Sequence, residues 1–155
     1  MLELTQNLLS EIYAESKRGY PHEACGFVAG TIEQGVRKAA QVFCCKNIQN
    51  ELHTKDPLRY PRQAETAYTI DPKEMAEVEK KAKAQGLKLL SIFHSHPEHG
   101  VYFSAEDKEM AAPWGEPLFP ELSYLVVSVY AGEVKNASEF YWDGNAKDFV
   151  EKKIL

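Results

Sequence analysis

The stretch LKLLSIFHSHPEHGVYFSAED, from Leu87 to Asp107, determines the fold that we expect. Its first seven residues are mostly apolar, which is typical of a strand that is buried on both faces. His94 and His96 follow at the end of this strand, and Pro97 prevents it from continuing. Because alternate residues of an extended segment point to the same side, both imidazoles can converge on one point. The stretch therefore predicts a buried strand that ends in two converging histidines.

Two interpretations of this histidine pair are open from the pattern alone. The pair could be two solvated side chains at a polar strand end. Neutral imidazole is also a good zinc ligand, and a catalytic zinc typically has three protein ligands and one position left for water. The H-E-x-x-H helix of many zinc proteases is absent, because Ala24, Cys25 and Gly26 follow His22-Glu23. A carboxylate that acts as a base would come from elsewhere, and Glu23 is one candidate among many acids.

The sequence Ser104-Ala105-Glu106-Asp107 has the S-x-x-D pattern of a capping box. It predicts a short helix over residues 105–112 that ends before Pro113. A helix start also holds the Asp107 carboxylate in one place, and a carboxylate is a suitable third zinc ligand. The capping role and the ligand role are therefore compatible.

The flanking sequence predicts further helices and strands around this centre. In order, they are a helix that ends at Gly19, a hairpin over residues 25–45, a loop over 49–66, a helix from Asp71 to Gly86, the strand 87–93, the short helix 105–112, strands at 122–130 and 135–142, and a closing helix over 145–155. This order predicts a mixed α/β (α+β) fold, in which a mixed β-sheet is flanked by helices. The length of 155 residues predicts one domain over residues 1–155.

Composition excludes several classes of function. The net charge of -5 argues against nucleic acid as a partner, because phosphate binding needs clustered positive charge. No apolar run approaches the roughly 20 residues that span a bilayer, so we expect no membrane partner. The first residues, MLELTQNLLSEIYAE, lack the basic start and apolar core of a signal peptide. The three cysteines do not form a disulfide pattern, and we therefore expect a cytoplasmic protein.

Taken together, these motifs resemble the JAMM (MPN-plus) metalloprotease family. The pattern of that family is an early glutamate, then H-[ST]-H-P, six further residues, and S-x-x-D. This sequence has Glu23 in the stretch YPHEACGF, then HSHP at 94–97, six residues at 98–103, and then Ser104 and Asp107. The spacing matches without gaps and no motif position is substituted. The resemblance spans roughly residues 21–130 and implies the sheet-and-helix JAMM/MPN core, which is similar to that of cytidine deaminases.

The resemblance also implies a role for each matching residue. His94, His96 and Asp107 would hold one catalytic Zn²⁺, and Glu23 would be the base. Ser104 would donate a hydrogen bond to the oxyanion that forms during hydrolysis, a role that fits preorganised stabilisation of developing charge. Some members of the family have lost the ligands and act as scaffolds, whereas the ligand set is complete here.

The chain is short and has room for an insertion only at residues 49–66. It therefore resembles the small bacterial members, some of which are similar to enzymes that trim ubiquitin-like sulfur-carrier proteins. The implied activity is hydrolysis of a peptide or isopeptide bond after the Gly-Gly of such a carrier, whose C-terminal tail would be the partner. The alternatives are an inactive MPN-type binding module with a structural zinc, and a zinc hydrolase that acts on another amide. Whether His99 or Tyr102 contacts substrate stays open, as does the oligomeric state.

Overall fold

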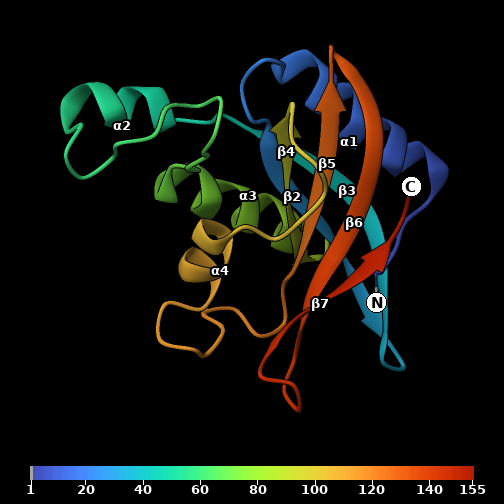
Figure 1. Ribbon diagram of the computed structural model, residues 1–155. Coiled ribbons are helices and arrows are strands. Elements are labelled where there is room, and N and C mark those ends of the chain that lie inside the picture. Colours follow the sequence, from blue (N-terminus) through green and yellow to red (C-terminus); the bar gives the residue numbers. More distant parts are fainter. Residues whose placement is uncertain (1) are drawn as a thin grey trace.

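A computed structural model, which describes residues 2–155, shows a mixed sheet of seven strands in the order β1-β3-β2-β4-β5-β6-β7 (Figure 1). Along the chain the elements are β1 (Leu2–Glu3), α1 (Gln6–Gly19), β2 (Cys25–Glu33), β3 (Val36–Cys45), α2 (Gln49–Lys55), α3 (Pro72–Ala84), β4 (Lys88–Pro97), α4 (Ala105–Ala111), β5 (Ser123–Tyr130), β6 (Glu133–Asp143) and β7 (Asp148–Lys153). The predicted mixed sheet with flanking helices is confirmed. The predicted hairpin is confirmed as well, because β2 and β3 pair antiparallel.

β4 lies in the middle of the sheet, as the apolar run predicts. It pairs antiparallel with β2 and parallel with β5. Its side chains alternate between the two faces of the sheet. Phe93 belongs to a cluster of buried residues on one face, and Ile92 packs against two clusters on the other face. His94 and His96 have the same parity as Ile92 and therefore lie on its face of the sheet.

Helices cover both faces of the sheet (Figure 1). α1 begins after Thr5, whose side chain accepts a hydrogen bond from the N–H of Leu8, and it buries Ile12 against one face. α3 begins after Asp71, which caps the N–H of Lys73, and it buries Val78 against the opposite face. α4 lies on the same side of the sheet as α3 in Figure 1. The histidines therefore lie on the face that α3 and α4 cover.

The predicted closing helix over residues 145–155 is wrong. Residues 148–153 form β7, which pairs antiparallel with β6. Phe149 packs against the rings of Phe103 and Tyr124, with ring centroids 4.7 and 5.7 Å apart. Ile154, five positions on, packs against the cluster on the other face. Phe149 and Ile154 thus pack on opposite faces of the sheet, which fits the two-residue period of a strand. The backbone of β6 also supplies hydrogen-bond partners for this strand, and the local sequence does not reveal them.

The predicted loop over residues 49–66 is wrong in its first part, because α2 occupies residues 49–55. Gln49 explains why this helix stays close to the rest of the segment. Its buried side chain donates to the carbonyl of Arg62 at 2.9 Å and accepts from the Thr69 hydroxyl at 2.7 Å. One buried polar side chain thus fixes the path of residues 62–69.

Within residues 2–155, none of the helices combines the length and the apolar character that crossing a membrane requires.

Gly26 tests how tightly the centre of the sheet is packed. A Cβ atom added at Gly26 would lie 2.2 Å from the carbonyl oxygen of Phe43 and 2.5 Å from the ring of Phe93. We expect Gly26→Ala to lower the free energy of unfolding by about 1–3 kcal/mol, because the backbone carbonyl cannot move away easily. The measurement is chemical denaturation, with Gly144→Ala as the control, since a Cβ there meets nothing within 4 Å. Equal stability of the two variants would contradict this account of the packing.

Candidate metal centre

The two histidines of β4 meet at their Nε2 atoms. These atoms lie 3.1 Å apart, and the side chains of His94 and His96 are 0% and 6% exposed. In register, His94 lies between Cys25 of β2 and Val126 of β5. The pair is therefore buried in the sheet, and the interpretation as solvated side chains is wrong.

Asp107 completes this cluster from the start of α4. The predicted capping box is present: the Ser104 hydroxyl accepts from the Asp107 N–H, and Asp107 Oδ2 accepts from the Ser104 N–H, both at 3.0 Å. The same Oδ2 atom lies 3.3 Å from His94 Nε2 and 3.6 Å from His96 Nε2. The cap thus holds a carboxylate oxygen beside both imidazoles.

The spacing of these three atoms fits one small cation. Ligand atoms about 2.0–2.2 Å from a tetrahedral zinc lie about 3.3–3.6 Å from one another. The observed separations are 3.1, 3.3 and 3.6 Å. Two imidazole nitrogens and one carboxylate oxygen are also a donor set that suits Zn²⁺. The chain therefore has a site that could hold a metal.

The two imidazoles are oriented in different ways. His96 Nδ1 lies 3.0 Å from the carbonyl of Gly100, so Nδ1 carries the proton and Nε2 is free to bind a metal. Among residues 2–155, His94 Nδ1 is buried and has no hydrogen-bond partner. The ring of Tyr68 instead stacks on His94, with centroids 4.4 Å apart and planes at 22°. The stacked ring of Tyr68 therefore restrains the orientation of the His94 ring, whereas a hydrogen bond restrains that of His96.

Glu23 faces the same cluster from the segment before β2. It is buried, and one of its carboxylate oxygens lies within 4.8 Å of ring nitrogens of both His94 and His96. Two carboxylates thus flank the histidine pair, and Asp107 Oδ2 lies 3.3 Å from His94 Nε2 and 3.6 Å from His96 Nε2. Either carboxylate is thus near enough to take part in a metal site with the two imidazoles.

The backbone around Glu23 is held at three points. Its N–H donates to the carbonyl of Ala64 at 2.7 Å, and its carbonyl accepts from Asn47 Nδ2 at 2.9 Å. The next residue, Ala24, donates its N–H to the hydroxyl of Ser95 at 2.7 Å. Sequence analysis missed Asn47 and Tyr68 because neither belongs to the motif. Ser95 does belong to the motif, and its position between the two histidines could have indicated that it helps to hold the site.

Burial dominates the electrostatics of the site. Burial raises the pKa of Glu23 to about 8, and the nearby charge of His96 only partly opposes this shift. Burial lowers the pKa of His94, which favours the neutral form that binds metals, although Asp107 acts in the opposite direction. Burial alone would raise the pKa of Asp107, but the charges and hydrogen bonds of the two histidines outweigh it and lower that pKa. Two carboxylates beside two imidazoles form the kind of perturbed cluster that marks functional sites.

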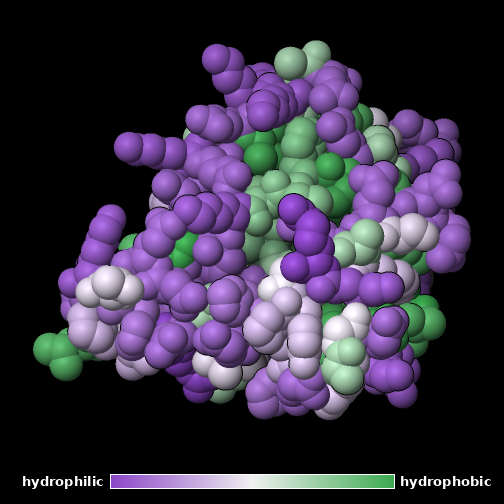
Figure 2. All heavy atoms as spheres, turned by 90° about the horizontal axis from the view of Figure 1, so that it is seen from above, coloured by the Kyte–Doolittle hydropathy of each residue, from purple (hydrophilic) through white to green (hydrophobic). Residues whose placement is uncertain are grey.

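The cluster opens into a cleft of about 980 Å³ that is lined by Glu23, His96, Ser104 and Asp107. His99 and Tyr102 also line this cleft, and the ring of Tyr102 lies 4.9 Å from that of His96. The opposite wall comes from residues 59–62 and 66–69. Figure 2 looks down onto the end of the sheet where β4 and β5 terminate, and hydrophilic side chains cover most of this face. All five predicted site residues are thus brought together.

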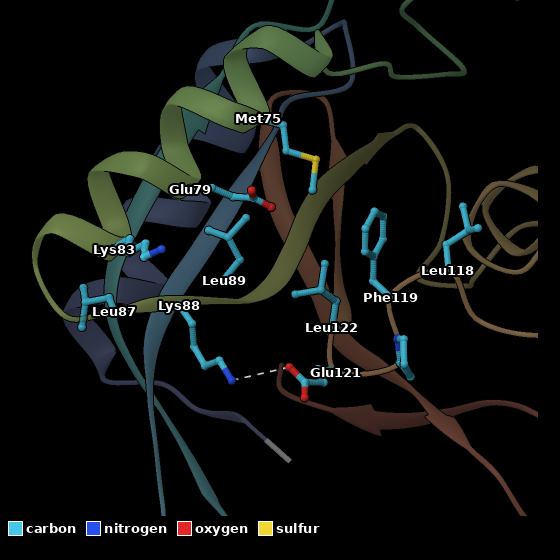
Figure 3. Close-up of a pocket in the computed structure, with 11 residues that line it drawn as sticks. Met75, Glu79, Lys83, Leu87, Lys88, Leu89, Leu118, Phe119, Glu121 and Leu122 are labelled. Carbon is cyan, nitrogen blue, oxygen red and sulfur yellow. Dashed lines mark hydrogen bonds and ion pairs between the residues drawn. The ribbon is translucent and has the colours of Figure 1, made fainter.

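A separate cavity of about 570 Å³ lies near the beginning of β4, far along the strand from His96 (Figure 3). Its lining is mainly apolar, with Met75 of α3 opposite Phe119, and the ion pair of Lys88 and Glu121 at 3.5 Å lies beside it. It contains no residue of the histidine cluster. The larger cleft is therefore the candidate site.

Comparison with known proteins assigns a family to this arrangement. A family model that describes prokaryotic homologs of the JAB domain matches residues 5–143. The chain belongs to this family. The resemblance to JAMM/MPN-plus proteins that the sequence indicates is thus confirmed.

Individual relatives of this JAB-family chain agree with the assignment. A desampylase of Haloferax volcanii is 27% identical over 131 residues, which cover 82% of this chain and 80% of that protein. The solution structure of a Desulfitobacterium hafniense protein has a TM-score of 0.75 and 26% identity, and the match covers 100% of this chain and 92% of the other. A Salinibacter ruber protein has a TM-score of 0.66 and 27% identity, with 97% and 88% covered.

Tyr68 gives the first test of the site. We expect Tyr68→Leu to weaken Zn²⁺ binding about tenfold, because groups that orient a ligand typically contribute that much. Tyr68→Phe keeps the stacked ring and should bind Zn²⁺ like the unaltered protein. The measurement is competition with a chelating indicator dye. If the Leu and Phe variants have the same affinity, the stacked ring does not orient His94.

Proposed function

We propose that this chain is a zinc-dependent peptidase or isopeptidase. His94, His96 and Asp107 would hold the zinc, and Glu23 would be the general base. The observation that carries the proposal is the convergence of three ligand atoms within 3.1–3.6 Å of one another at the side of a cleft, with a buried second carboxylate close by. Burying two carboxylates beside two imidazoles costs folding free energy, which a bound cation would offset.

When bound, zinc would supply Lewis acidity, which makes water more acidic and polarises a carbonyl oxygen. The residues of the chain would do the rest. The Glu23 carboxylate would accept a proton from the attacking water and deliver it to the nitrogen of the leaving amine. A pKa raised to about 8 by burial makes Glu23 a stronger base than an exposed carboxylate. A cation at the histidines would lower that pKa again, so the two effects oppose each other.

Ser104 is suited to stabilise the oxyanion that forms when water adds to the carbonyl carbon. Its Oγ accepts the hydrogen bond of the Asp107 N–H, which leaves its own hydrogen free to donate. Because Ser104 lines the cleft and precedes α4, its position is fixed before substrate binds. A fixed donor is more effective than one that must reorganise during the reaction.

The substrate that we propose is the C-terminal tail of a ubiquitin-like sulfur-carrier protein, cut after Gly-Gly. A glycine-rich tail can lie extended where larger side chains would clash, and it can pair with backbone along a cleft wall. Residues 66–69 form such a wall: Asn47 and Ile48 hold Ala67 and Thr69 from behind through hydrogen bonds of 2.9–3.1 Å. The relative named desampylase supports hydrolase activity for the family. The alternative is a binding module with a structural zinc.

Metal content tests the ligand assignment. We expect about one zinc per chain in purified protein, as in three-ligand catalytic sites. His96→Ala should remove it, because two remaining ligands hold zinc weakly. Elemental analysis after dialysis is the measurement, and His53→Ala is the control, since His53 contacts Tyr60 and lies outside the cluster. Full zinc occupancy in the double variant His94→Ala/His96→Ala would refute the assignment.

Glu23→Gln separates the base from the ligands. The variant should retain zinc but lose most of its turnover, on the order of 10²-fold or more, because the proton can no longer be transferred. The substrates are ubiquitin-like carriers that are extended after Gly-Gly, and mass spectrometry measures the trimmed product. A near-normal rate would mean that another carboxylate is the base. If the unaltered protein leaves such carriers intact but cuts unfolded peptides, it is a general peptidase. If it cuts neither, the binding-module alternative holds.

A further inference from the structure

The loop that follows β4 begins with a strained residue. Glu98 has a φ of 59°, in the left-handed region that is uncommon for residues other than glycine. Glycine would adopt this conformation without strain. A residue with a side chain keeps it only where surrounding contacts hold it there, and such residues gather at functional sites. The contacts of Glu98 therefore show what the strain maintains.

The Glu98 carboxylate joins two parts of the chain that are distant in sequence. Its Oε1 atom accepts hydrogen bonds from the Tyr20 hydroxyl at 2.5 Å and from the Ala131 N–H at 2.7 Å. Tyr20 directly follows α1, and Ala131 lies in the turn between β5 and β6. The Glu98 N–H also donates to the Val129 carbonyl at 2.7 Å. One residue thus ties the loop to the end of α1 and to the hairpin of β5 and β6.

The next two residues carry this restraint to the histidine cluster. The His99 carbonyl accepts a hydrogen bond from the hydroxyl of Ser128, a buried residue of β5. The Gly100 carbonyl, one residue farther along, lies 3.0 Å from His96 Nδ1. A Cβ atom at Gly100 would meet nothing within 4 Å, so side-chain packing does not hold this residue. The position of its carbonyl therefore depends on how the adjoining residues are fixed.

We propose that Glu98 is a positioning residue that acts on His96 through the Gly100 carbonyl. By fixing residues 98–100, it keeps this carbonyl where it accepts the proton on Nδ1, and it thereby keeps Nε2 directed at the other two ligand candidates. The consequence for metal binding rests on the proposed function, because a metal is what Nε2 would bind. The orientation of the ring does not rest on it.

Tyr20 gives the same contact a second consequence. Tyr20 lies three residues before Glu23, so its hydrogen bond to Glu98 links the segment that leads to Glu23 with the loop that follows His96. Neither Tyr20 nor Glu98 lines the cleft. Glu98 would therefore act from outside the cleft, without touching a ligand itself.

The first test measures Zn²⁺ affinity by competition with a chelating indicator dye. We expect Glu98→Ala to weaken binding about tenfold, the lower end of the effect of groups that orient metal ligands. Glu98→Gly should weaken binding equally although it relieves the backbone strain, because it also removes the carboxylate. Glu98→Gln should bind like the unaltered protein, since its amide oxygen can accept both hydrogen bonds. Tyr20→Phe, which removes only a hydroxyl, should weaken binding less than Glu98→Ala.

Glu133→Ala is the matched control. Glu133 is an exposed carboxylate at the start of β6, and like Glu98 it contacts the α1 region, through Lys17 at 3.7 Å. It has no contact with residues 98–100 among the ion pairs and hydrogen bonds of residues 2–155. The variant should keep the Zn²⁺ affinity of the unaltered protein.

The second test uses the metal-free protein and separates positioning from a purely structural role. Nuclear magnetic resonance follows the exchange of the His96 Nδ1 proton with solvent, and thermal unfolding is recorded for each variant. We expect exchange to be about tenfold faster in Glu98→Ala than in Glu98→Gln, because the acceptor of this proton is no longer fixed. A structural role alone would change the melting temperature and leave both the exchange rate and the Zn²⁺ affinity of the folded protein unaltered.

Two outcomes would overturn the proposal: unchanged Zn²⁺ affinity in Glu98→Ala, and a Glu98→Gly variant that binds as tightly as the unaltered protein. If Glu98→Ala does not fold, unchanged affinity and exchange in Tyr20→Phe would overturn it instead. If the unaltered protein binds no zinc, the metal site of the proposed function fails, and proton exchange decides the role of Glu98. Equal exchange in the Ala and Gln variants then refutes positioning, and faster exchange in the Ala variant supports it.

Discussion

Backbone pairing along both edges of β4 is the constraint on which this structure depends. β4 is fixed antiparallel to β2 and parallel to β5, so none of its residues can change face without breaking both ladders. His94 and His96 therefore point to the α3 and α4 side together. Ser95, between them, points to the other face and holds the backbone of Ala24 through its hydroxyl at 2.7 Å. One short stretch thus brings two metal-ligand candidates and the neighbour of Glu23 into fixed positions.

The same residues stabilise the fold and form the site. The hydrogen bonds of the capping box start α4 and also keep the Asp107 carboxylate beside the histidines. Burial disfavours the charged form of Glu23 and raises its pKa to about 8, whereas the two imidazoles lower the pKa of Asp107 despite its burial. A divalent cation at the three ligand atoms would offset this cost, because it attracts both carboxylates. Both the electrostatics and the geometry of the cluster therefore favour a bound cation.

The segment between β3 and α3 forms part of the cleft beside this cluster. Asn47 contacts both the Glu23 carbonyl and the Ala67 carbonyl, so one side chain joins the proposed base to the wall that substrate would meet. Farther along, Arg62 pairs with Glu106, and both side chains line the cleft. The sheet thus carries the histidine cluster, and this segment forms part of the cleft beside it.

The sequence by itself determined the elements whose signals are local. The apolar run before His94 specified the central strand, the S-x-x-D pattern specified the cap of α4, and Asp71-Pro72 specified the start of α3. The spacing of the motif was enough to predict five residues that the fold brings together, because each lies at a strand end, at a helix start or just before a strand.

Tertiary structure alone decided the rest. Residues 148–153 form a strand because the open edge of β6 was available, and α2 stays in place because buried Gln49 bonds to Arg62 and Thr69. The stacking of Tyr68 on His94 likewise joins residues 26 positions apart, and no local pattern encodes it. Such contacts depend on which surfaces meet after the chain has folded, and local periodicity contains no information about that.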